Sequence, residues 1–151
     1  RDLASLRVIG FSRGEAAYVL LGELGLVTLL ALAVYFWMAF KVGKARGTFN
    51  IPAPRMDGPD DFLRVLRVQG NTTEVLLLFL PALWLFALSI GDMWAALVGV
   101  IFPIGRVVYA RGYYAEALKR STGFTIGLLS IVVLWLGAAI ALAMQAIAAY
   151  I

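Results

Sequence analysis

The sequence has 151 residues and contains no cysteine and no histidine. The missing cysteines exclude disulfides, thiolate metal sites and a protein thiol as the nucleophile of a reaction. The missing histidines exclude the side chain that most often carries acid–base catalysis near neutral pH. Thiol chemistry is therefore open to this chain only if a substrate brings the sulfur.

Charged residues are also scarce. They make up 15% of the chain, whereas 62% of the residues are hydrophobic, against about 25% and about 45–50% in soluble domains. This composition indicates an integral membrane protein. One span needs about 20 residues, so the length predicts four helices with short loops and no separate soluble domain. The net charge is +4, but no basic stretch is interleaved with aromatic residues in the way that nucleic-acid surfaces are. We therefore expect no nucleic-acid partner.

Four apolar runs are predicted to cross the membrane as helices. None alternates with a period of two residues, and lipid admits only helices or closed barrels. The stretch "GTFNIPAPRMDGPDD", rich in proline and glycine, predicts a polar loop after the first run. The runs cover residues 17–40, 68–90, 94–110 and 123–151. The predicted fold class is an all-α integral membrane protein, a bundle of four transmembrane helices.

Basic residues concentrate in two connecting segments, 41–67 and 106–120, whereas the turn at 89–93 and the tail after residue 121 have none. The positive-inside rule places both basic segments in the cytoplasm and both ends of the chain outside. The style of the sequence points to a bacterial inner membrane.

The N-terminal stretch does not fit this orientation, because three of its arginines would lie on the outer side. Residues 2–30, with "LRVIGFSRGE" followed by "LLGEL", resemble the segment ahead of a transmembrane helix in FtsX-type ABC-transporter permeases. An amphipathic interfacial helix is the alternative. We therefore treat 1–16 as an atypical N-terminal segment, from an unusual gene start or a fusion junction, and 17–151 as the membrane domain.

The stretch "RVLRVQGNTTE" carries polar residues into the second apolar run. A rise of 1.5 Å per residue places Glu74 roughly 15 Å beyond Arg64, well inside the apolar zone. A charge there costs about 2.5–3.5 kcal/mol, so such residues mark functional sites. Arg64 is interpreted as a cytoplasmic anchor. Arg67, Asn71 and Glu74 are interpreted as one polar network, with Gln69 beside it. Spacings of three and four residues give this face: Arg64, Arg67, Asn71 and Glu74.

The third run has a matching polar face at its cytoplasmic end. Arg106, Tyr109 and Tyr113 follow at i, i+3 and i+7, while Arg111 falls elsewhere and reads as a surface cation. Interfacial tyrosines alone are typical of an aromatic belt. Cations, phenols and an amide that converge on one side of the membrane, with Arg120 at the mouth of the following loop, predict a receptor for a small anionic ligand.

Together, "RVLRVQGNTTE", "FLPALW", "GRVVYARGYY" and "KR.TG" resemble the MAPEG superfamily, the membrane-associated proteins in eicosanoid and glutathione metabolism. Microsomal glutathione transferases and leukotriene C synthase are the most similar members, and the likeness covers residues 30–145. The resemblance implies a homotrimer of four-helix subunits that binds glutathione between neighbours. By position, the residues that match glutathione contacts are Arg46, Arg67, Gln69, Asn71, Glu74, Arg106, Tyr109, Tyr113 and Arg120.

The resemblance also implies the reaction. Arg120 matches the arginine thought to hold the thiol as a thiolate, and a nearby guanidinium raises the thiolate fraction of a group that titrates near pH 8.5. We therefore predict a glutathione transferase of detoxification, with glutathione as cosubstrate, no metal, and a hydrophobic electrophile or lipid hydroperoxide from the bilayer. One alternative is a non-catalytic lipid-binding scaffold of the same family. Another is a fragment of an ABC permease, which predicts a partner ATPase and a large extracytoplasmic domain.

Overall fold

A computed structural model describes residues 13–150, with side chains from residue 22 onward. The described chain contains helices and no strand, and four of its helical segments are long and apolar enough to cross a membrane. The four-helix prediction is thus confirmed. The segment predicted to be atypical lies mostly outside the described residues. The helices are α2 (Arg13–Phe49), α3 (Asp60–Ser89), α4 (Asp92–Gly99), α5 (Ile101–Ala115), the short 3₁₀ helix η1 (Ala117–Arg120) and α6 (Ser121–Ala149).

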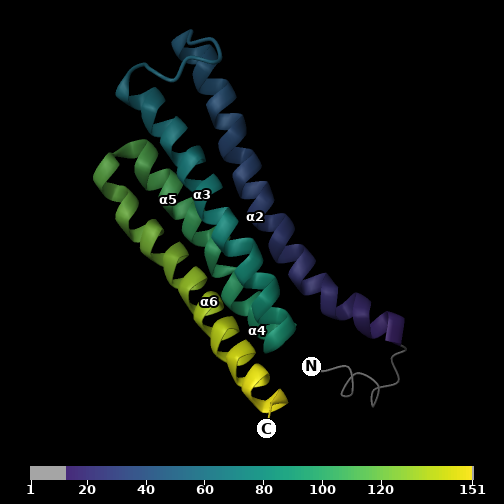
Figure 1. The fold of residues 1–151 in the computed structure, drawn as a ribbon. Coiled ribbons are helices and arrows are strands. Elements are labelled where there is room, and N and C mark those ends of the chain that lie inside the picture. The colour runs from purple at the N-terminus through teal and green to yellow at the C-terminus, as the bar shows by residue number, and fades with distance from the viewer. Residues whose placement is uncertain (1–12, 151) are drawn as a thin grey trace.

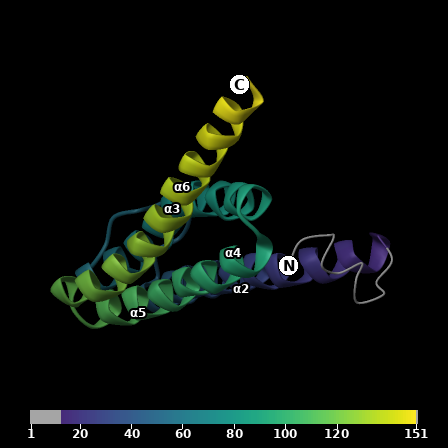
Figure 2. The same cartoon turned by 90° about the horizontal axis from the view of Figure 1, so that it is seen from below.

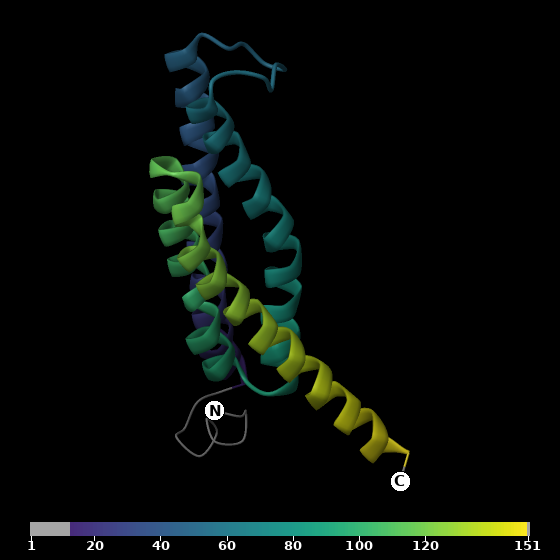
Figure 3. The same cartoon turned by 90° about the vertical axis from the view of Figure 1, so that its left-hand side faces the viewer.

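The spans run alternately up and down (Figure 1). The loop between α2 and α3 and the junction between α5 and α6 lie at the same end of the bundle, and the α3–α4 turn lies at the other. Both basic segments are therefore at one end, as the charge pattern predicts. Seen from below, the start of α2 and the end of α6 extend away from the other helices in different directions (Figure 2), and Figure 3 shows α6 projecting past the bundle.

Two predicted loops are much shorter in the structure. α2 continues to Phe49, so the basic residues after the first apolar run are helical and the α2–α3 loop spans only 50–59, rather than 41–67. α5 likewise continues to Ala115, which leaves little of the predicted 106–120 loop. Lysine and arginine are good helix formers, and their long stems lie along apolar surface. The charges therefore end the apolar run without ending the helix.

The third span is two helices rather than one. α4 ends at Gly99 and α5 begins at Ile101, with Val100 between them. Proline has no N–H and cannot donate to the carbonyl four residues earlier. Pro103 therefore leaves the carbonyl of Gly99 without its helical partner, which accounts for the break at this point.

α5 and α6 contact each other through glycines. A methyl group added to Gly123 would lie 2.0 Å from the main-chain nitrogen of Tyr109, and one added to Gly105 would lie 2.6 Å from the nitrogen of Gly127. The two backbones thus touch directly, the packing that small residues allow between membrane helices. Below this seam, the stacked rings of Phe79 and Phe102, with centroids 4.0 Å apart, fill the core. This glycine seam, at Gly105 on α5 and at Gly123 and Gly127 on α6, fixes the position of the α5 polar face relative to α6.

Candidate functional site

Arg106 is the buried cation of the site. It is 2% exposed, and its Nε and Nη2 donate to the hydroxyl of Thr72 at 3.2 and 2.5 Å. Its guanidinium carbon lies 3.8 Å from the ring centroid of Tyr109. Thr72 in turn donates to the carbonyl of Val68 at 2.7 Å. Within the described chain no carboxylate forms an ion pair with Arg106.

Sequence reasoning missed Thr72, because threonine in an apolar helix is usually bonded to its own backbone. The sequence carries no signal for it, because the burial of Arg106 is seen only in the structure. A buried guanidinium needs acceptors, and Thr72 supplies one from the facing helix.

Tyr109 joins the two predicted polar faces. Its hydroxyl accepts a hydrogen bond from Asn71 Nδ2 at 2.7 Å, and its ring packs edge-on against Tyr113 with centroids 5.7 Å apart. Tyr109 is 1% exposed. Arg106, Tyr109 and Tyr113 are all buried on one side of α5, so the predicted face is correct, and Arg111 is exposed as predicted.

Arg120 closes the site from the junction of η1 and α6. Its Nη1 donates to the hydroxyl of Tyr113 at 2.9 Å, and its guanidinium lies 5.0 Å from that ring centroid. The junction folds tightly back on α5, because a methyl group on Gly112 would lie 2.3 Å from the carbonyl oxygen of Lys119. This close approach of the two main chains therefore fixes the backbone position of Arg120.

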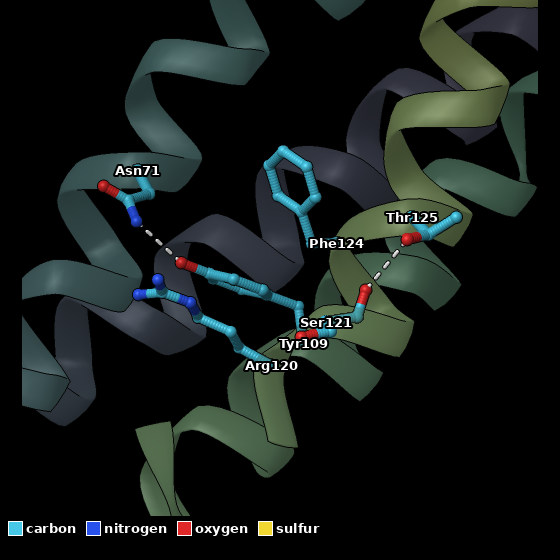
Figure 4. Close-up of a pocket in the computed structure, with 6 residues that line it drawn as sticks. All are labelled: Asn71, Tyr109, Arg120, Ser121, Phe124 and Thr125. Atoms are coloured by element: carbon cyan, nitrogen blue, oxygen red, sulfur yellow. Dashed lines mark hydrogen bonds between the residues drawn. The ribbon is translucent and has the colours of Figure 1, made fainter. Parts of the chain in front are cut away.

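Tyr109, Asn71 and Arg120 border an open pocket of about 310 Å³. It combines a guanidinium, a phenol and an amide with the apolar ring of Phe124 (Figure 4). Sequence reasoning missed its α6 side, although spacings of three and four residues from Ser121 give the shared face. Such a pocket can hold an anion next to an apolar molecule. It is lined by Asn71, Tyr109, Arg120, Ser121, Phe124 and Thr125.

The polar network predicted on α3 does not form within the chain. Asn71 bonds to Tyr109 instead, and in the described residues no ion pair joins Arg67 to Glu74. Seven residues span about 10.5 Å of helix, too far for direct pairing, and both side chains are exposed. Arg64 pairs with Asp61 in the first turn of α3, and its interpretation as an anchor stays a prediction.

Two other predicted residues have partners away from the pocket. Gln69 donates to the hydroxyl of Tyr35 at 2.6 Å, on the α2 side of α3. Arg46 donates to the carbonyls of Ile51 and Arg55 at 3.4 and 2.7 Å and so holds the α2–α3 loop.

Of the nine predicted site residues, the structure gathers five in and around the pocket and places four elsewhere. The gathered residues are Asn71, Arg106, Tyr109, Tyr113 and Arg120. The others are Arg46, Arg67, Gln69 and Glu74. Whether any of them contacts glutathione stays a prediction. The described residues include no group of three metal-ligating side chains.

Comparison with known proteins agrees with the resemblance. The chain is 44% identical to an uncharacterized protein of Synechocystis sp. over 80% of this chain and 88% of that protein. It is 33% identical to human microsomal glutathione S-transferase 2 over 70% and 71% of the two chains. It is 36% identical to rat leukotriene C4 synthase over 64% and 65%. The model of the MAPEG family matches residues 24–140, and the chain therefore belongs to this family.

Proposed function

We propose that the chain is a membrane glutathione S-transferase that joins the sulfur of glutathione to hydrophobic electrophiles. The observation that carries the proposal is the place of Arg120, fixed by the Tyr113 hydroxyl and lining a pocket with an apolar wall at Phe124. A fixed cation beside an apolar surface suits attack by an anionic sulfur on an apolar molecule. Two relatives, microsomal glutathione S-transferase 2 and leukotriene C4 synthase, support the same reaction class by the activities that they are named for.

The role proposed for Arg120 is to stabilise the glutathione thiolate. A free thiol has a pKa of about 8.5, so roughly a few per cent is ionised at pH 7. Arginine stays protonated in proteins, so contact with its guanidinium lowers the pKa of the thiol. Each unit of lowering corresponds to about 1.4 kcal/mol. The sulfur can then attack without help from a protein cysteine or histidine.

The charged ends of glutathione need partners of their own. Arg106 is a cation without a carboxylate partner in the described residues, and Arg67 is exposed on α3. We assign the two glutathione carboxylates to these arginines. Glu74, also exposed on α3, then supplies the negative charge that the glutathione ammonium requires.

We also propose that the active form is a homotrimer. Arg67 and Glu74 are exposed on α3 within a candidate membrane span, where contact with lipid is unfavourable. A neighbouring subunit would cover this face, and its Arg46 and Gln69 could then reach the shared site. The family resemblance supplies the number three. A mass measurement in detergent that finds a stable, active monomer would contradict this assembly.

The side of the membrane that the pocket faces is inferred from the basic residues of the connecting segments. The pocket lies towards the end of the bundle that carries the basic segments, so the positive-inside rule predicts that it faces the cytoplasm. The electrophile enters from the bilayer, which concentrates apolar molecules. Lipid hydroperoxides are a second proposed substrate class.

The test is glutathione conjugation by the purified protein, with an activated chloroarene as electrophile. Arg120→Ala should lower kcat at pH 7 by about tenfold or more, while the glutathione KM changes little. Raising the pH should recover part of the lost rate, because hydroxide then supplies the thiolate. Arg111→Ala is the matched control, since Arg111 is exposed on α5, and its rate should equal that of the parent.

The lipid-binding scaffold predicts a different result. It requires that the parent bind apolar molecules without conjugating any of them.

An Arg120→Ala variant that loses affinity for glutathione but keeps its turnover and pH profile would contradict the role proposed for Arg120. Arg120 would then bind the ligand rather than stabilise the thiolate.

A further inference from the structure

Some conjugations need a proton as well as a thiolate. When a sulfur anion opens an epoxide, a C–S bond forms and a C–O bond breaks, and the released oxygen must take up a proton. Displacement of chloride from an activated arene needs none, because chloride leaves as a stable anion. The sequence has no histidine and no cysteine, so a proton donor in this pocket must be of another kind.

Most residues of the pocket have no proton to offer. The hydroxyls of Ser121 and Thr125 already donate to main-chain carbonyls of the preceding turn, at 3.1 and 3.0 Å. Arg120 remains protonated in proteins. The amide of Asn71 and the ring of Phe124 have no acidic hydrogen.

Tyr109 is the remaining group, and its hydrogen is not used by its neighbour. The phenol oxygen accepts the bond from Asn71 at 2.7 Å, so the phenol O–H is free to donate to another oxygen. The hydroxyl end of Tyr109 and the guanidinium of Arg120 both point towards α3 (Figure 4). The proton donor and the proposed thiolate partner therefore lie in the same pocket.

The surroundings of Tyr109 also suit the anion that is left behind. The Arg106 guanidinium lies 3.8 Å from the ring centroid and the Asn71 amide donates to the oxygen. A positive charge and a hydrogen-bond donor both stabilise a phenolate. Because both partners are in place before the reaction, little reorganisation is needed when the proton leaves.

We propose that Tyr109 is the general acid for electrophiles whose leaving atom is oxygen, and this inference rests on the transferase function proposed above. The sulfur electron pair forms the C–S bond, the C–O pair moves to the oxygen, and the phenol proton passes to that oxygen. The phenolate regains a proton from water, which replaces the one that the glutathione thiol released. The product is a hydroxy thioether.

The test compares two electrophiles in one variant. Tyr109→Phe should lower kcat/KM for an aryl epoxide by about 100-fold, the size of effect typical of general acid catalysis. The same variant should lose much less of its activity towards an activated chloroarene, which needs no proton, so the ratio of the epoxide kcat/KM to the chloroarene kcat/KM should fall by about tenfold or more. Arg120→Ala should lower both rates, since both substrates need the thiolate.

Tyr114→Phe is the matched control. Tyr114 lies on the same helix and packs edge-on against Trp37, outside the pocket, and both of its rates should equal those of the parent. Incorporation of 3-fluorotyrosine at position 109 gives a second test that keeps the shape and the hydroxyl of the residue. It should move the alkaline limb of the epoxide rate to lower pH and leave the chloroarene profile in place.

Three results would overturn the assignment: equal losses for both substrates in Tyr109→Phe, an unchanged epoxide rate, or a parent enzyme that conjugates the chloroarene but not the epoxide. Failure of the transferase function itself looks different. In that case the parent converts neither substrate.

Discussion

The α5–α6 pair and the α2–α3 pair are held together in different ways. Between α5 and α6 the backbones touch, since a methyl group on Gly123 would lie 2.0 Å from the nitrogen of Tyr109. α2 and α3 are joined by longer side chains, such as the Gln69 to Tyr35 hydrogen bond of 2.6 Å. The residues of the pocket belong to α5, η1, α6 and the side of α3 that faces them. A site that needs fixed geometry is thus built on the seam with the least freedom.

The largest expected effect is at that seam. Gly123→Ala should lower the free energy of unfolding by about 3 kcal/mol or more, because main chain rather than a flexible side chain must move to admit the methyl group. The pocket should be lost with it. Thermal unfolding in detergent, read together with glutathione binding, gives the measurement.

Gly43→Ala is the control on the other helix pair. A methyl group there meets nothing within 4 Å, and replacing glycine by alanine inside a helix should stabilise by up to about 1 kcal/mol. A Gly123→Ala variant as stable as Gly43→Ala would show that α5 and α6 have room to separate, and the contrast between the two pairs would fail.

Two neighbouring threonines on α3 sharpen the comparison. Thr72 faces α5 and accepts from the buried Arg106, whereas the exposed Thr73 donates to Tyr35 on α2 at 3.1 Å. Thr72→Val should cost about 1–3 kcal/mol, because it leaves a buried guanidinium short of an acceptor. Thr73→Val should cost under about 1 kcal/mol, because water can replace an exposed partner.

Chemical denaturation of both variants gives the two free energies. Glutathione affinity is the second readout, and it should fall in Thr72→Val alone because Arg106 loses its position. A larger loss in Thr73→Val would place the critical polar contact on the α2 side.

The sequence predicted the helices well and their ends poorly. Four apolar runs give four spans because lipid leaves few alternatives. The runs end where charges begin, but Arg46 lies on α2 and the helix continues to Phe49, since a charged residue can remain helical while its head group reaches water.

The site was predictable where one helix determines it. Arg106, Tyr109 and Tyr113 share a face at helical spacing, which follows from periodicity alone. Thr72 could not be found in this way, and spacing alone could not show that the Ser121 and Phe124 face of α6 lines the pocket, because both depend on which helix packs against which. The network predicted for Arg67 and Glu74 does not form for a different reason. Both residues share a face of α3, but they stand two turns apart.

The smallest expected effect is at the α2–α3 loop, where the resemblance and the structure give Arg46 different roles. The resemblance makes it a glutathione contact. In the structure its Nη1 donates to the carbonyls of Ile51 and Arg55, and its guanidinium lies 5.5 Å from the ring centroid of Phe62. Arg46→Ala should therefore cost about 1 kcal/mol and speed protease cleavage within residues 50–59.

Lys44→Ala is the control for Arg46→Ala, since Lys44 is exposed in the same turn of α2 and should leave cleavage unchanged. The glutathione KM separates the two roles, because the loop lies away from the pocket of its own chain. If KM rises tenfold while cleavage stays at the parent rate, Arg46 binds the ligand, and within the trimer it must do so in the site of a neighbour. If cleavage rises and KM holds, Arg46 stabilises the loop, and the carboxylates of glutathione depend on Arg67 and Arg106 alone.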